Sequence, residues 1–397
     1  MIKIFTAFTQ EIEDAEAAVR EICEQLDPAK NAMKHTVGII HFYYEFVDTG
    51  VCQAIIDALP FELSGCVSSY LATDAKYGDI ALTVTMITSD NNDMSVRVIE
   101  QVDRKSKEEI SNELIQMCGE LCAKENPKLV IPFIPPLPHH GGDDLVKIVN
   151  QLPNPFPMFG TISFNTEESS GSNYVIGGGK ISPAYAFIAF YGDMKPTFHI
   201  TSAFAFDDSF GGLAEITESE GLVLKKINDM TPLRYLKEQG MITSDNLVTG
   251  SAVWAVPAIL TYPNEVKVVR AFLEIVKDTE YIVSTGEMET GTKIRFAFVD
   301  GVKTLASAEK LLNELIETKK NDILAYSCAA RAWSLGAKFF SEAQKISEGA
   351  REYLKANNEQ LVYSVAYSGG EICPVLDNSG KLVNALHNYT LIACSFS

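Results

Sequence analysis

Residues 321–396 carry three polar motifs, Cys328-Ala329-Ala330-Arg331, Gly369-Gly370-Glu371 and His387-Asn388-Tyr389-Thr390. An apolar segment typical of a β-strand ends at each of the first two motifs, and another begins at the last one. An amphipathic segment typical of a helix separates the first motif from the second. The stretch therefore predicts a strand, a helix and two further strands.

The same order of segments occurs twice earlier, each time after an alternating strand and a long amphipathic helix. A repeated order of this kind indicates one β-α-β-α-β-β unit used three times. The segments of the first unit are 2–8, 12–26, 36–42, 53–59, 62–70 and 79–87; those of the second are 95–102, 107–125, 128–133, 144–152, 158–164 and 184–191; those of the third begin with 293–299 and 306–319. Since no helix precedes the last strand of a unit, that strand is expected to be antiparallel, in mixed sheets.

The predicted class is therefore α/β (mixed α+β), with mixed sheets covered by helices. The interval 197–291 does not fit the unit and is predicted as an antiparallel insertion between the second and third units. Its expected strands, separated by turn-forming residues, are 251–262, 266–276 and 280–284. The chain is accordingly divided into an N-terminal domain, 1–230, and a C-terminal domain, 231–397, that contains the insertion and the third unit.

The composition indicates a compact protein with more than one core, because 397 residues with 46% hydrophobic and 21% charged side chains are typical of soluble globular proteins. A net charge of −19 without a run of Lys or Arg argues against nucleic-acid binding. The apolar runs are well short of the roughly 20 residues that cross a bilayer, so no interaction with a membrane is predicted. Eight scattered cysteines indicate reduced thiols and a cytoplasmic location.

Common catalytic and cofactor motifs are absent from the sequence, which favours a protein that is not an enzyme. Gly177-Gly178-Gly179-Lys180 resembles a phosphate-binding loop, but Ile181 follows the lysine and a strand is expected next, so a hairpin turn is predicted. The pair His139-His140, followed by Asp143 and Asp144, could bind a divalent metal ion, but adjacent side chains in a loop seldom converge on one ion. Asp143 or Asp144 is more simply the N-cap of the next helix. No metal and no cofactor are predicted.

The polar residues of the three motifs are the candidate binding site. Arg331, Glu371 and His387 each follow or open an apolar strand, and ligands of α/β sheets commonly lie beyond strand ends. An arginine can hold a carboxylate and a glutamate an ammonium group, so Arg331 and Glu371 together suit an amino acid. The alternative is a structural ion pair between Arg331 and Glu371.

The same motifs supply three further candidates for ligand binding. Asn388 lies at the start of the final strand, where its amide can orient a ligand or close a turn. Gly370 permits either the close approach of a ligand or a bulge. Cys328 lies near a strand end, and Cys328 or His387 would be the reactive group of an enzyme, although a reactive thiol requires a lowered pKa and a positioned base.

These motifs resemble those of FIST-domain proteins, a bacterial family of sensory proteins with an N-terminal and a C-terminal FIST domain. The order Cys328-x-x-Arg331, Gly370-Glu371-Ile372 and His387-Asn388-Tyr389-Thr390 closely resembles the family pattern Cys-x-x-Arg, Gly-Glu-Ile and Asn-x-Thr. In the N-terminal half the resemblance rests on segments such as Gly65-Cys66-Val67-Ser68-Ser69. Family members often continue this segment with Gly-Glu, where this chain has Tyr70-Leu71, so the resemblance implies an altered or lost site in the first unit.

The resemblance implies a cytoplasmic protein that binds a small molecule such as an amino acid and signals to a histidine kinase, a cyclic-di-nucleotide enzyme or a chemoreceptor. Since the chain shows no such output module, it would signal through a separate partner. Two alternatives remain open, namely an enzyme of unknown reaction that uses the same pocket and a haem-binding gas sensor, for which no particular histidine is implied. A pocket between the N- and C-terminal parts is the expected site.

Overall fold

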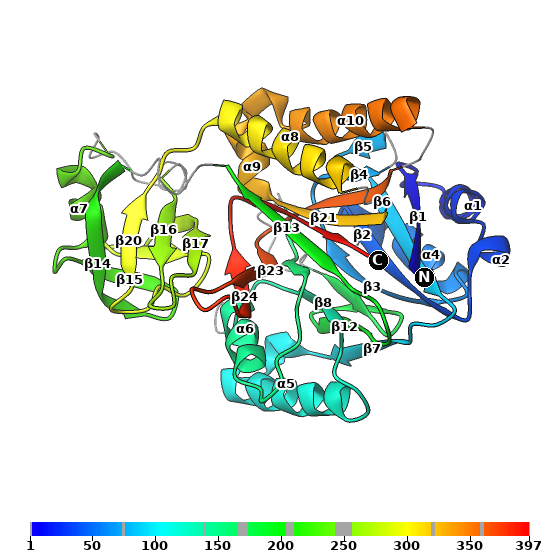
Figure 1. The fold of residues 1–397 in the computed structure, drawn as a ribbon, viewed down its shortest axis with the longest axis horizontal. Coiled ribbons are helices and arrows are strands. Elements are labelled where there is room, and N and C mark those ends of the chain that lie inside the picture. The colour runs from blue at the N-terminus through cyan, green and yellow to red at the C-terminus, as the bar shows by residue number, and fades with distance from the viewer. Residues whose placement is uncertain are drawn as a thin grey trace.

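The computed structural model describes residues 2–73, 76–137, 140–165, 174–203, 210–242, 256–318, 322–357 and 361–396. It confirms the predicted class, with mixed sheets covered by helices. Figure 1 shows a main body of three six-stranded sheets with their helices and, on the left, a lobe that contains a seven-stranded sheet between residues 210 and 296. We call this lobe the insertion.

Each sheet of the main body is built around four strands, which we call the first, second and third units in chain order. Within a unit the strands lie in the order first, fourth, second, third, and the second and third strands are parallel. The strands are β1 (Ile2–Thr9), β2 (His35–Phe42), β3 (Glu62–Val67) and β6 (Leu82–Ser89); β7 (Met94–Ile99), β8 (Leu129–Ile134), β9 (Gly160–Ile162) and β12 (Tyr185–Phe190); and β13 (Thr197–Ser202), β21 (Asp322–Cys328), β22 (Val362–Ser368) and β25 (Thr390–Ser395).

A β-hairpin follows the third strand of each unit and completes the sheet of another unit. The hairpin of the first unit pairs with β22, that of the second with β3, and that of the third with β9. The hairpins are β4 (Leu71–Thr73) with β5 (Lys76–Gly78), β10 (Val175–Gly177) with β11 (Lys180–Ser182), and β23 (Glu371–Leu376) with β24 (Leu382–His387). The exchanges form a closed cycle, so every unit depends on another for a complete sheet.

The turn between β10 and β11 confirms the hairpin predicted at Gly177-Gly178-Gly179-Lys180. Gly178 and Gly179 form the two-residue turn, with φ of +59° and +74°. Both values lie in the left-handed region that glycine adopts without steric cost, as a tight hairpin turn requires. The turn-rich residues 167–173 that precede this hairpin lie outside the described part of the chain.

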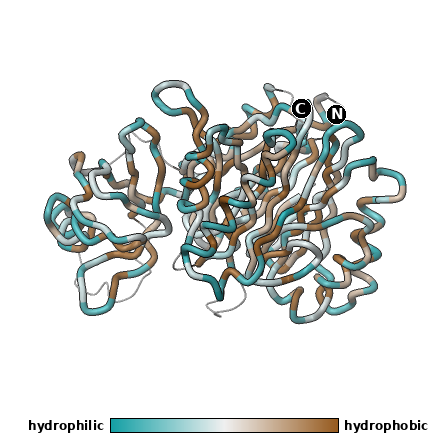
Figure 2. Tube along the Cα trace, turned by 90° about the horizontal axis from the view of Figure 1, so that it is seen from below, coloured by the Kyte–Doolittle hydropathy of each residue, from teal (hydrophilic) through white to brown (hydrophobic). Residues whose placement is uncertain are grey.

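Helices cover the outer faces of the three sheets, whose inner faces share one core (Figure 1). The helices of the body are α1 (Ala15–Leu26), α2 (Pro28–Asn31), α3 (Glu45–Asp48), α4 (Val51–Ala58), α5 (Lys107–Cys122), α6 (Gly142–Asn150), α8 (Gly301–Glu317), α9 (Ala329–Ser334) and α10 (Ser341–Asn357). In the core the ring of His41 contacts Phe133 and Tyr326, with centroids 5.7 and 5.6 Å apart, and burial lowers the pKa of His41 to about 4. Figure 2 shows the hydrophobic strands at the centre and hydrophilic segments around them.

The first strand of the third unit is β13, so the prediction that placed it at residues 293–299 was wrong. β13 pairs antiparallel with β25, whereas β20 (Lys293–Phe296) pairs with β14 (Phe210–Glu220) and β16 (Ala258–Thr261) of the insertion. The local pattern favoured the wrong segment because residues 293–299 also alternate and directly precede a long helix. The insertion therefore lies inside the third unit, between β13 and α8, and the boundary predicted between residues 230 and 231 falls within it.

The insertion is antiparallel, as predicted, and has its own hydrophobic core. Its elements are β14 (Phe210–Glu220), β15 (Val223–Ile227), α7 (Pro232–Glu238), β16 (Ala258–Thr261), β17 (Lys267–Arg270), β18 (Phe272–Ile275), β19 (Ile282–Ser284) and β20. The single strand predicted over residues 266–276 is divided at Ala271, because β17 pairs with β16 and β18 pairs with β19. Residues 243–255, which include the start of another predicted strand, lie outside the described part of the chain.

Candidate ligand-binding pocket

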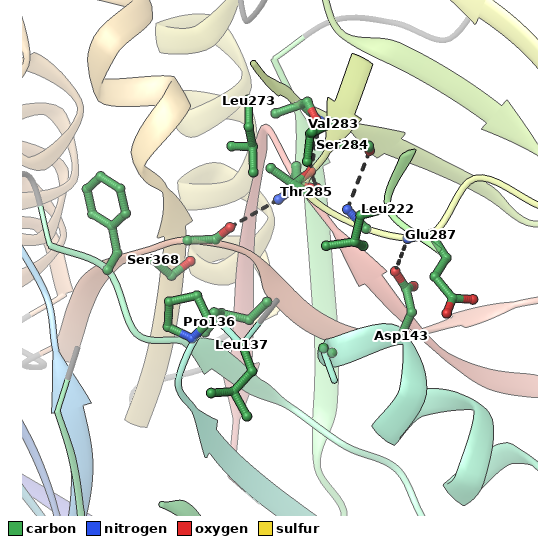
Figure 3. A pocket seen from close by; sticks show the side chains of 18 of the residues that line it. Pro136, Leu137, Asp143, Leu222, Leu273, Val283, Ser284, Thr285, Glu287 and Ser368 are labelled. Atoms are coloured by element: carbon green, nitrogen blue, oxygen red, sulfur yellow. Dashed lines mark hydrogen bonds between the residues drawn. The ribbon is translucent and has the colours of Figure 1, made fainter. Parts of the chain in front are cut away.

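A pocket of about 760 Å³ lies between the insertion and the main body. Figure 3 shows Leu222, Leu273 and Val283 of the insertion on its upper side and Pro136 and Leu137 of the second unit below. The third unit closes a further side. Other residues of the lining are Asp143, Phe164, Thr285, Glu287, Cys328, Ala330, Trp333, Ser368 and Asn388.

The pocket lies beyond the carboxyl ends of two parallel strand pairs. β8 runs parallel to β9, and β21 runs parallel to β22, so the two strands of each pair end at the same edge of their sheet. The residues after β8 (135–137), after β9 (163–165) and at the end of β21 (328–330) all line the pocket. This is the edge at which ligands of α/β sheets commonly bind.

The side chains that remain accessible in the pocket are mainly apolar. Leu273 and Trp333, which both line the pocket, are 52% and 43% exposed, and the ring of Phe164 packs edge-on against Trp333 with centroids 5.6 Å apart. A ligand that covers these side chains removes apolar surface from water, which favours binding. The half-buried apolar residues of the lining are Leu137, Phe164, Leu222, Val223 and Val283.

A buried ion pair joins the insertion to the body beside the pocket. Arg270, at the end of β17, donates from Nη2 to Oδ1 of Asp143 at 2.7 Å and from Nη1 to the carbonyl oxygen of Leu386 at 2.7 Å. The second oxygen of Asp143 accepts from the backbone N–H of Glu287 at 2.7 Å (Figure 3). Gly286 packs against this pair, since a Cβ at that position would lie 2.5 Å from Nε of Arg270.

Charged residues at one side of the pocket are also paired. The ammonium group of Lys107 lies 2.6 Å from Asp144 and 3.6 Å from Glu287, and Lys147 forms ion pairs with Glu287 and Glu289. Lys107, Lys147 and Glu289 are partly exposed, so these pairs stabilise the fold less than the buried pair does. They extend the contact between the insertion and the second unit.

The predicted residue Asn388 belongs to the pocket wall, in the turn between β24 and β25. Its Nδ2 donates to the carbonyl oxygen of Gly369 at 3.2 Å, and its Oδ1 accepts from the hydroxyl of Thr285 at 2.6 Å. Asn388 is 1% exposed, so its amide ties the insertion to the third unit from behind the pocket surface. Tyr389 follows in the left-handed region, with φ of +57°, as the tight turn requires.

Arg331 does not line the pocket, although the sequence assigned it as a ligand anchor. Its guanidinium is completely buried and donates to Glu342 from Nε at 2.9 Å and also from Nη2. Further bonds reach the carbonyl oxygens of Thr304 and Tyr389. Arg331 therefore forms a structural ion pair, as the alternative prediction held. Its partner is Glu342, at the start of α10, and not Glu371.

Glu371 and His387 face each other on β23 and β24, and both are buried away from the lining. The carboxyl of Glu371 accepts from the hydroxyls of Ser368 at 2.5 Å and Thr390 at 2.7 Å, and burial raises its pKa to about 8. The ring of His387 lies 3.3 Å from the carbonyl oxygen of Cys373, and burial lowers its pKa to about 3. Both side chains are therefore predominantly uncharged at neutral pH.

The raised pKa of Glu371 predicts a pH-dependent contribution to stability. Between the ordinary value of 4.5 and about 8 the carboxyl is ionised when the chain is unfolded and protonated when it is folded. Stability is therefore lost as pH rises through this window, by about 1.4 kcal/mol per pH unit. Glu371→Gln cannot ionise, so the free energy of unfolding of the wild type is expected to fall relative to the variant between pH 5 and pH 8. An unchanged difference at the two pH values would refute the assignment.

Cys328 and Gly370 lie at the third-unit side of the pocket. Cys328 lines the wall with 3% exposure, and burial, with the nearby Glu371 carboxyl, raises the pKa of its thiol. It is therefore a protonated thiol rather than an activated nucleophile. Gly370 leaves room for the amide of Asn388, because a Cβ at residue 370 would lie 3.2 Å from its Nδ2.

Tyr70-Leu71 occupies in the first unit the place that Gly370-Glu371 occupies in the third. Leu71 and Glu371 each open the exchanged hairpin and pair with the third strand of another unit, β22 or β9. The ring of Tyr70 packs against Phe339 and Tyr367, with centroids 5.1 and 5.5 Å apart, and Leu71 is buried. Aromatic packing therefore replaces the buried carboxyl at this junction.

Several lining residues had no distinguishing signal in the sequence. Leu222, Leu273, Val283 and Thr285 come from turns and strands of the insertion, whose position over the body is a tertiary feature. The segment from His140 to Asp144, which stands out in the sequence as a cluster of polar residues, lines the pocket. The prediction that Asp143 or Asp144 is the N-cap was wrong, because Gly141 is the N-cap of α6. Asp143 instead binds Arg270, and the carboxylate of Asp144, in the first turn of the helix, accepts from the N–H of Gly141.

The described residues contain no group of three or more His, Cys, Asp or Glu side chains placed to hold a metal ion. His139, which the sequence grouped with His140, lies outside the described part of the chain. Within the same described ranges, none of the helices has both the length and the hydrophobicity that crossing a membrane requires.

An interlocked α/β body with a mainly apolar pocket under an inserted lobe is an architecture suited to binding a small molecule. Residues 37–230 match the FIST N domain and residues 233–374 match the FIST C domain, so the chain belongs to the FIST family. FIST domains are sensory domains that bind small ligands in signal transduction. A comparison with curated proteins finds no match to this chain.

Proposed function

We propose that the pocket between the insertion and the main body is the sensory site of this protein. The observation that carries the proposal is its position, beyond the carboxyl ends of β8, β9, β21 and β22 and beneath the insertion. A ligand there contacts the insertion and two units of the body at once. Its binding therefore favours one placement of the insertion, and a free-energy difference between placements is what a signal requires.

We further propose that the protein is cytoplasmic and passes the signal to a separate partner, such as a histidine kinase, a cyclic-di-nucleotide enzyme or a chemoreceptor. The family resemblance implied an amino acid or another small polar molecule as the ligand, and the sequence assigned Arg331 and Glu371 as its anchors. Because Arg331 and Glu371 are buried and bonded, the proposal no longer uses them as charged anchors. Asn388, Cys328 and Gly370 keep a place in it as residues of the wall or directly behind it, and His387 supports the same β-hairpin.

A thermal-shift screen against amino acids, carboxylates and uncharged apolar compounds tests the site when it is combined with Leu222→Asp. Leu222 lines the pocket from the turn between β14 and β15, so an aspartate there places an unpaired charge against a bound apolar group. A compound at a hundredfold excess over its dissociation constant should stabilise the wild type by about 2.7 kcal/mol. The shift should disappear in Leu222→Asp.

Leu213→Asp is the matched control, because Leu213 lies on β14, is 54% exposed and is not part of the pocket lining. It carries the same change of side chain and charge in the same lobe. A stabilising compound that acts equally on wild type, Leu213→Asp and Leu222→Asp would show that the sensory site lies elsewhere. Loss of the response in both variants would likewise remove the support for this pocket.

The two alternatives find little support in the described geometry. An enzyme that uses Cys328 would require an ionised thiol, whereas burial raises the pKa of this one. A haem would require an axial ligand, and His140, the described histidine of the lining, is 1% exposed, with Nδ1 2.8 Å from the hydroxyl of Tyr185. In this geometry the ring of His140 is therefore not accessible as an axial ligand. The absorbance spectrum of the purified protein tests this alternative.

A further inference from the structure

We infer that the ligand of this pocket is an uncharged molecule with an apolar body, recognised by surface burial rather than by ion pairing. The inference rests on the proposed function and specifies the chemical class that the site takes. It differs from the zwitterionic amino acid that paired anchors at Arg331 and Glu371 would select.

The charged side chains of the pocket lining are already in ion pairs. Among the described residues, five charged side chains line the pocket, and each already has an oppositely charged partner. The partners are Arg270 for Asp143, Lys107 for Asp144, Lys147 and Lys107 for Glu287, and Lys225 for Glu220. A charged ligand group in the buried part of the pocket would compete with an existing partner or lose its water without gaining one, and both outcomes oppose binding.

Three uncharged polar side chains of the lining are already hydrogen-bonded to the protein. Ser368 and Asn388 are each 1% exposed and bond to the protein, to Glu371 and to Gly369 respectively. The half-buried hydroxyl of Thr285 donates to Asn388 and accepts from the N–H of Ala271 at 3.0 Å. These three groups hold the wall together, so they offer little hydrogen bonding to a ligand. Ser163, whose buried hydroxyl has no hydrogen-bond partner among the described residues, and half-buried Asn165 also line the pocket, and both are uncharged, so they suit an uncharged polar group such as an amide.

The side chains that remain accessible to a ligand in the pocket are mainly apolar. The apolar side chains come from both sides of the pocket, with Leu222, Leu273 and Val283 on the insertion and Phe164 and Trp333 on the body. The two aromatic rings of the lining, Phe164 and Trp333, suit a flat or ring-bearing ligand. A ligand of this kind gains affinity from the apolar area that it buries, and its binding should depend little on salt.

The test uses three probes with one skeleton, 4-cyclohexylbutanamide, 4-cyclohexylbutanoate and 4-cyclohexylbutylamine, titrated calorimetrically into the full chain at pH 7.5. The amide is expected to bind at least about tenfold more tightly than either charged probe, because only the charged heads need a partner that the wall does not supply. Its dissociation constant should change by less than about twofold between 0.05 and 0.5 M NaCl.

Tighter or equal binding of the carboxylate or the amine overturns the inference, and so does the absence of binding by all three. Lys107→Gln sharpens the comparison, since a carboxylate held at the charged side should lose affinity in that variant and the amide should not. Failure of the inference stays distinguishable from failure of the proposed function. If a charged compound from the screen binds in a Leu222-dependent manner, the site stands and only the ligand class is wrong.

Discussion

Arg331→Met is expected to destabilise the main body by about 3–5 kcal/mol, because it leaves the buried carboxylate of Glu342 without its partner. Glu342 is completely buried, and its other oxygen accepts from the hydroxyls of Ser327 at 2.5 Å and Tyr367 at 3.1 Å. The ion pair thus joins β21, β22, α9 and α10. Since whole proteins are stable by only about 5–15 kcal/mol, this loss is a large fraction of the total.

Urea unfolding followed by far-UV circular dichroism measures the effect. The double variant Arg331→Met with Glu342→Leu should recover part of the loss, because it leaves no unpaired charge. Glu309→Gln is the matched control, since Glu309 forms an exposed pair with Lys345 between helices α8 and α10 at 3.2 Å. That change should cost less than about 1 kcal/mol. A folded Arg331→Met protein of wild-type stability that fails to bind ligand would instead support the anchor role.

Arg270→Met is expected to weaken the attachment of the insertion by a similar amount, about 3–5 kcal/mol. The variant leaves Asp143 unpaired and removes the bond to the carbonyl oxygen of Leu386. The insertion has its own core, so the lobe itself should remain folded. We expect faster amide hydrogen exchange in α6 and β24, which meet the lobe, and little change in β1 and β6.

Hydrogen exchange with mass spectrometry separates this local loosening from global unfolding. Glu215→Gln serves as the control, because Glu215 forms an exposed ion pair with Lys293 within the insertion. It should leave exchange in α6 and β24 unchanged. Wild-type protection of these elements in Arg270→Met, or equal loss of protection throughout the body, would contradict the role of this pair as the attachment.

The sequence was sufficient for the class of fold because strand and helix periodicity are local. It was insufficient for the first strand of the third unit, because β13 and residues 293–299 alternate equally well, and only pairing with β25 distinguishes them. The exchange of hairpins between units had no local signal either, since β4, β10 and β23 pair with strands of other units.

The candidate site could be predicted only in part for the same reason. Cys328 and Asn388 lie at strand ends, and the ends of parallel strands do line the pocket. The choice of ion-pair partner depends on how a helix packs, and Glu342 on α10 reaches Arg331 where Glu371 on β23 does not. The pair of Arg270 with Asp143 joins residues 127 positions apart, and neither belongs to a recognisable motif.

Tryptophan fluorescence tests whether a ligand binds in the pocket against Trp333. The chain has two tryptophans, and Trp254→Phe leaves Trp333 as the only one. Titration of this variant with 4-cyclohexylbutanamide, which does not absorb at the excitation wavelength, should give a saturable change in Trp333 emission that Leu222→Asp abolishes and Leu213→Asp preserves. A stabilising ligand that leaves Trp333 emission unchanged, or changes it equally in Leu222→Asp, would contradict the account.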